Sequence, residues 1–231
     1  MDTMTTGGTM TVAWMPMCGQ SWIGAAASFL GMWTVMMAAM MLPSLLPRLW
    51  RYRRAISLAG ERRAAILTAI AGGAYLLVWA LLGVVVFPLG ATVMAIIARH
   101  PDMTRAVPAT VAALVLASGA LQLSRWKARH LAHCRESCSL QVLERGHNFA
   151  ASLLRAWLRG LRLGLHCAQC CAGLTTALLV TGMMDLPAMI AVTAAITLER
   201  LAPAGERVAR AIGLMVLGGG LLLSLRAAGL G

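Results

Sequence analysis

Methionines concentrated in one short stretch are the first candidates for chemistry. Five of the 16 methionines fall within residues 32–41. On a helix, Met36 and Met40 lie about 40° apart, and Met37 and Met41 form a second such pair. Thioether sulfur is soft, uncharged and insensitive to pH, so it suits Cu(I) or Ag(I) and offers little to zinc, magnesium or calcium. The spacing predicts a soft-metal site, although methionine also serves as a flexible filler between helices.

A denser group of potential ligands follows later in the chain, at His166-Cys167-Ala-Gln-Cys170-Cys171. On a helix, Cys167 reaches Cys170 and Cys171 on the next turn, and His166 reaches Cys170. Sulfur–metal bonds of about 2.3 Å allow two thiolates on adjacent turns to share one ion, with a third ligand from another helix. Two alternatives stay open: the cysteines are small buried apolar residues, or Cys167 and Cys170 form a C-x-x-C pair for thiol–disulfide exchange.

Three further positions carry weaker signals. Cys134 and Cys138 are four residues apart in a basic segment that favours thiolates, so they predict an exchange site from which a partner takes the ion. Met183 and Met184 follow a long apolar run and predict a second metal port at its outer end. Glu199 is either a buried carboxylate or a loop charge.

The elements that position these residues are predicted from hydropathy. The chain is 59% hydrophobic and 12% charged with a mean hydropathy of +0.76, which predicts an all-α, polytopic membrane protein and excludes a soluble enzyme fold. Pro88 and Gly90 are expected to stop the second helix. Runs without charged residues predict one membrane domain over residues 22–231 with six transmembrane helices, at 22–46, 64–87, 107–123, 163–181, 187–201 and 208–225.

The distribution of charge predicts the topology. Of the 20 basic residues, 17 fall in the last turn of, or in the segments after, the first, third and fifth predicted helices. The positive-inside rule places those segments in the cytoplasm and both termini in the periplasm of a bacterial inner membrane. Residues 1–21 then form a periplasmic tail rich in Met and Trp, without the charged start of a cleavable signal peptide. In the cytoplasmic loop 124–162, the segment from Asn148 predicts an amphipathic helix on the membrane surface, with its arginines at lipid headgroups.

These motifs together resemble a bacterial family of integral membrane proteins predicted to bind metal and often labelled putative copper chaperones. The resemblance covers about residues 14–225, and it includes GMWTVMMAAMMLPSLLP at residues 31–47, Cys134-x-x-x-Cys138, Cys167-x-x-Cys170-Cys171, Gly182-Met183-Met184-Asp185-Leu186 and Glu199. The chain departs from the family pattern at His166, where the family has an aromatic residue. The resemblance implies copper as the cargo.

We therefore expect an inner-membrane protein that binds a soft metal, most simply Cu(I), and delivers it for copper homeostasis or metalloprotein maturation. Its expected partners are membrane lipid, a copper-dependent membrane or periplasmic protein and a second copy of itself, and nucleic acid is not among them. No hydrolase triad or phosphate-binding loop occurs, so we expect no enzyme. The alternatives are a membrane thiol oxidoreductase that uses the cysteine cluster, and a structural or assembly subunit of a membrane complex.

Overall fold

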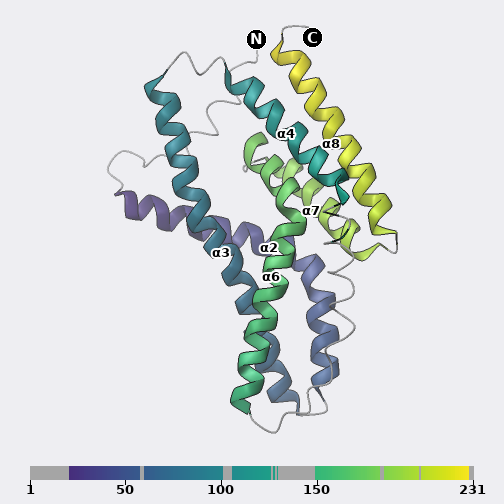
Figure 1. Ribbon diagram of the computed structural model, residues 1–231. Helices are drawn as coiled ribbons and strands as arrows, with labels where there is room; N and C mark the ends of the chain where they lie inside the picture. The colour runs from purple at the N-terminus through teal and green to yellow at the C-terminus, as the bar shows by residue number, and fades with distance from the viewer. Residues whose placement is uncertain are drawn as a thin grey trace.

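The computed structural model describes residues 21–57, 60–100, 106–125, 127, 129, 149–182, 185–202 and 204–228. Within these ranges the chain is all-helical and contains no strand, which confirms the predicted all-α class. Four helices, α2, α3, α6 and α8, are long and apolar enough to cross a membrane, whereas α4 is a shorter apolar helix. The six helices of these ranges (Figure 1) are α2 (Trp22–Ile56), α3 (Glu61–Arg99), α4 (Val107–Leu123), α6 (Phe149–Thr181), α7 (Leu186–Leu201) and α8 (Gly205–Ala227).

Two helices are longer than the sequence pattern predicts. Helix α2 continues through Pro43 and Pro47 to Ile56, and α3 continues through Pro88 to Arg99, so the prediction that Pro88 and Gly90 end a helix is wrong. A proline removes one backbone hydrogen bond, but in an apolar setting the remaining backbone groups are best satisfied by continuing the helix. Helix α4 has the predicted bounds, and α7 and α8 lie within three residues of theirs.

Helix α6 joins two elements that the sequence pattern separates. The predicted surface helix from Asn148 and the predicted span from residue 163 are one continuous helix of 33 residues, about 50 Å long. It packs closely on α3. The absence of a side chain at Gly160 allows this, since a Cβ there would collide with the backbone carbonyl of Ala71. A small apolar core ties its first half to the end of α2 and the start of α3; it contains Tyr52, Ile56, Ala64, Leu67, Ala71 and Ala156.

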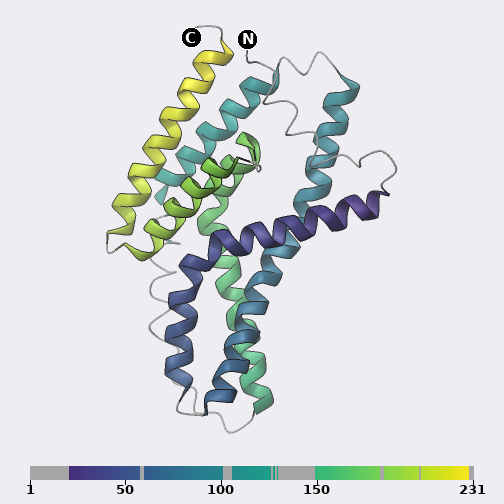
Figure 2. The same ribbon diagram turned by 180° about the vertical axis from the view of Figure 1, so that it is seen from behind.

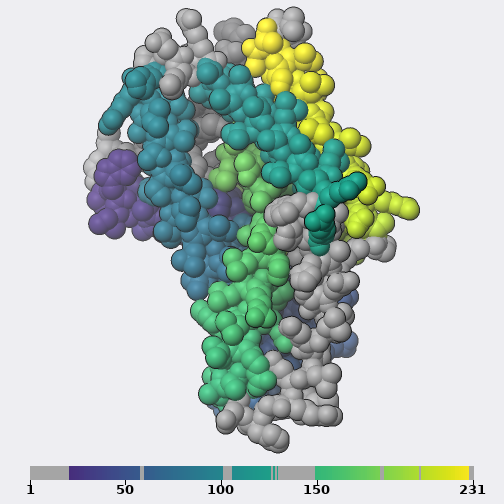
Figure 3. Space-filling model, viewed as in Figure 1, coloured from purple at the N-terminus to yellow at the C-terminus, as the bar shows by residue number. Residues whose placement is uncertain are grey.

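The helices form two groups that share α6. Helix α2 bends in the region of its prolines, so that its first half crosses the middle of the molecule and its second half runs beside the starts of α3 and α6 (Figures 1 and 2). Helices α4 and α8 lie side by side (Figure 3). Helix α7 packs against both α8 and α2. The crossing half of α2 therefore meets α3, α6 and α7, and the largest buried core of the protein lies there.

Candidate metal centre

The methionine group of α2 and the cysteine group of α6 meet in the core. All seven side chains are buried, with Met41 0% and Cys167 1% exposed, and they belong to one continuous cluster. Helix α2 turns its methionine face inward, and α6 presents the face on which Cys167, Cys170 and Cys171 follow each other at helical spacing. The seven sulfur-bearing residues of the cluster are Met36, Met37, Met40, Met41, Cys167, Cys170 and Cys171.

One sulfur pair spans the two helices directly. The Sγ of Cys167 lies 3.7 Å from the Sδ of Met41. Two sulfur atoms that bind one ion at about 2.3 Å in a trigonal arrangement lie about 4 Å apart, so this pair is close to the spacing that two ligands of one ion require. Among the described residues, no three His, Cys, Asp or Glu side chains come together as a metal site. A metal site here would therefore combine thiol and thioether sulfur. His166, which is half-buried on α6, does not form a three-residue ligand group with the described cysteines.

Aromatic side chains from α3 and α2 belong to the same buried core as the sulfur pair. The Tyr75 hydroxyl lies 2.8 Å from the Sγ of Cys167, and Tyr75 is itself only 1% exposed. The indole N–H of Trp33 donates a hydrogen bond of 2.8 Å to the backbone carbonyl of Trp79, which ties the methionine helix to α3. All three rings are buried in the core that contains the sulfur atoms. Sequence reasoning missed Tyr75; its polar hydroxyl within the long charge-free run that becomes α3 is the signal that could have identified it.

A buried positive charge lies beside the cluster. Arg200 on α7 is 7% exposed, and its guanidinium donates a long hydrogen bond of 3.5 Å to the Ser44 hydroxyl. Ser44 in turn donates to the backbone carbonyl of Met41, at 3.0 Å. Arg200 is one of the 17 basic residues that the sequence assigns to the cytoplasmic side, whereas the fold buries it beside Ser44, next to the backbone of Met41.

The remaining predicted ligands cannot be placed. Cys134, Cys138, Met183 and Met184 lie outside the residues that the structure describes. Glu199 is described, and it is a buried carboxylate rather than a loop charge.

Comparison with known proteins assigns a family. The model of the PpoB2 family, described as copper chaperone, matches residues 30–223, a range that contains both the methionine and the cysteine groups. No curated protein and no solved structure matches the chain. Since the match covers well over half of the sequence, the chain belongs to the PpoB2 copper chaperone family.

Proposed function

We propose that this protein binds Cu(I) inside a bacterial inner membrane and delivers it to a copper-dependent protein. The observation that carries the proposal is the contact between Cys167 and Met41 inside a buried cluster of four methionines and three cysteines. Membership of a copper chaperone family and four helices of membrane-spanning length support it. The clustering of basic residues supports periplasmic termini by the positive-inside rule.

The ligand chemistry suits a cargo that must be held and then released. One thiolate neutralises the single charge of Cu(I), and a neutral complex avoids the large cost of placing an ion in an apolar interior. Thioethers add soft ligands without adding charge. Because thioethers bind more weakly than thiolates, the two methionine pairs of α2 provide successive weak positions next to a tighter one at Cys167.

The burial of the thiols disfavours the oxidoreductase alternative. Thiol–disulfide exchange requires direct attack of one sulfur on another, so the partner must reach the reacting thiol. Cys167, Cys170 and Cys171 are all buried, and Tyr75 covers Cys167. A bare monovalent ion needs far less access than a protein disulfide does.

Metal analysis of defined variants tests the proposal. The protein is purified without oxygen in mild detergent from copper-supplemented cells, and its copper content is measured by mass spectrometry. We expect near-stoichiometric copper in the wild type and in the control M215L, whose methionine on α8 is 67% exposed. M41L and C167S are expected to lose most of it. A wild type without copper, or variants that retain as much copper as M215L, would contradict the proposal and favour an assembly role.

A further inference from the structure

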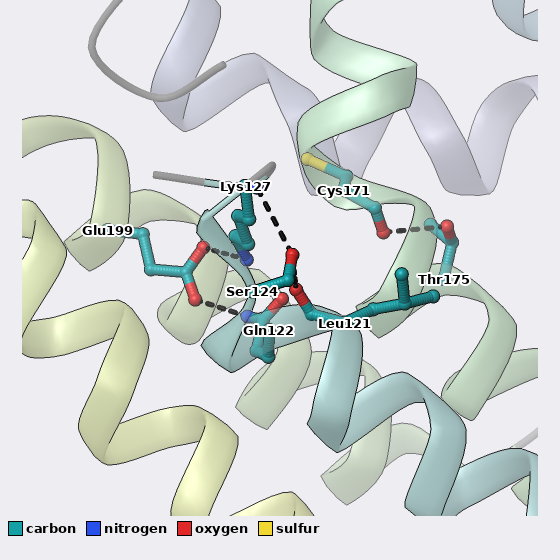
Figure 4. A network of polar contacts seen from close by, with 7 residues as sticks. All are labelled: Leu121, Gln122, Ser124, Lys127, Cys171, Thr175 and Glu199. Atoms are coloured by element: carbon teal, nitrogen blue, oxygen red, sulfur yellow. Dashed lines mark hydrogen bonds and ion pairs between the residues drawn. The ribbon is translucent and has the colours of Figure 1, made fainter. Parts of the chain in front are cut away.

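A second buried polar centre lies at the last turn of α7, beside Arg200. The Lys127 Nζ lies 2.7 Å from one carboxylate oxygen of Glu199, and both side chains are almost completely buried. The side-chain amide of Gln122 donates a hydrogen bond to the other oxygen. Figure 4 shows Gln122 and Lys127 approaching the two oxygens of Glu199. Ionisable groups at such depth are costly, and in membrane proteins they usually mark an ion or proton pathway.

Gln122 lies where four helices meet. Its Cβ faces Gly213 of α8, and its amide oxygen faces Gly173 of α6. That oxygen is buried and accepts no hydrogen bond within the part of the chain that the structure describes. A Cβ at Gly173 would lie 3.5 Å from it and 3.2 Å from the backbone oxygen of Ser118. Helix α6 therefore approaches α4 closely at Gly173, and the amide oxygen of Gln122 lies against the backbone of α6 without a hydrogen-bond donor from the described residues.

We propose that Glu199 is a proton-binding site that is coupled to the copper centre; this inference rests on the proposed function. Lys127 already holds the place that a metal cation would take beside the carboxylate, so a metal ion would have to displace a tethered ammonium. A proton needs no vacant position beside the carboxylate, because it binds directly to a carboxylate oxygen and Lys127 opposes it only through its charge. Copper movement in a protein without an ATP-binding motif is either passive or driven by a gradient, and a proton gradient is one that such a carboxylate can use.

The last turn of α7 links the proton site to the copper site. Glu199 contacts the end of α4, while the next residue, Arg200, contacts Ser44 on α2, which bonds to the carbonyl of Met41. Among the described residues, the charged groups that face Glu199 are Lys127 and Arg200. The charged residues at the start of α8, Glu206, Arg207 and Arg210, are exposed.

Protonation of Glu199 would remove the partner of Lys127, which lies beyond the end of α4 at Leu123. The uncompensated ammonium then moves toward water, and α7 is released from α4. Since the same turn of α7 carries Arg200, this movement changes the surroundings of Met41 and Cys167. Coupling between two sites is reciprocal, so bound copper must change the proton affinity of Glu199 by the same factor.

Infrared spectroscopy of the full-length protein in mild detergent tests this coupling. The carboxylic acid C=O band is recorded from acid to alkaline pH with and without Cu(I), and the Glu199 band is isolated by subtracting the spectra of E199Q. We expect Cu(I) to move the midpoint of this band by about one unit to lower pH, a tenfold coupling, because copper bound at Met41 and Cys167 holds α7 in the packed position in which Glu199 is paired with Lys127. The control E206Q removes an exposed carboxylate and is expected to leave the Glu199 band unchanged.

The double variant K127M/E199Q removes both charges and serves as the reference spectrum if E199Q alone does not fold. A midpoint that is the same with and without copper, in protein that carries copper, would overturn the coupling and leave the proposed function intact. A midpoint that follows the sodium concentration would overturn the proton in favour of a metal cation. Absence of copper from the wild type would instead overturn the proposed function.

Discussion

The buried pair between Lys127 and Glu199 makes a quantitative prediction about stability. The variant K127M leaves the Glu199 carboxylate buried without its cation, and E199Q leaves the ammonium without its anion. Removing one partner of such a pair costs about 3–5 kcal/mol, because the remaining charge is uncompensated. At roughly 2–4 °C per kcal/mol for a chain of this size, each single variant is expected to lower the Tm by roughly 6–20 °C.

The double variant K127M/E199Q separates charge from packing. It removes both charges together, so most of the lost stability is expected to return. Thermal unfolding in detergent is followed by intrinsic fluorescence, since Trp33 and Trp79 are buried and their environment changes on unfolding. Single variants with a wild-type Tm, or a double variant that loses the sum of the two single effects, would show that the pair does not hold α7 against α4.

Two further predictions concern the packing and the site. G160A places a methyl group against the carbonyl of Ala71 and is expected to lower the free energy of unfolding by about 1–3 kcal/mol. The control G73A has open space and is expected to be neutral or stabilising by up to about 1 kcal/mol. Equal thermal unfolding midpoints for G160A and G73A would contradict the close α3–α6 contact. Y75F removes the hydroxyl at Cys167 and is expected to change Cu(I) affinity about fivefold, the equivalent of one hydrogen bond, in competition with a Cu(I) chelator. An unchanged affinity would refute a role for Tyr75 at the metal.

The sequence predicts which segments are helical more accurately than it predicts the residues at which the helices begin and end. Hydropathy identifies the apolar segments, because a membrane span needs a minimum apolar length. It places the ends poorly at prolines, and Pro88 lies within α3 rather than beyond it. The periodicity of the arginines after Asn148 predicts a helix, but whether that helix continues into the next apolar segment depends on its packing against α3.

By itself the sequence determines the number and spacing of methionines on one segment and of cysteines on another, and from these it predicts a preference for a soft monovalent ion. Only the tertiary structure decides that the two groups meet, with Met41 against Cys167. It also decides that Tyr75 covers the thiol and that Glu199 is buried beside Lys127. The physical reason is that helical periodicity defines the faces within one helix, whereas the order and rotation of helices depend on contacts between residues far apart in the chain.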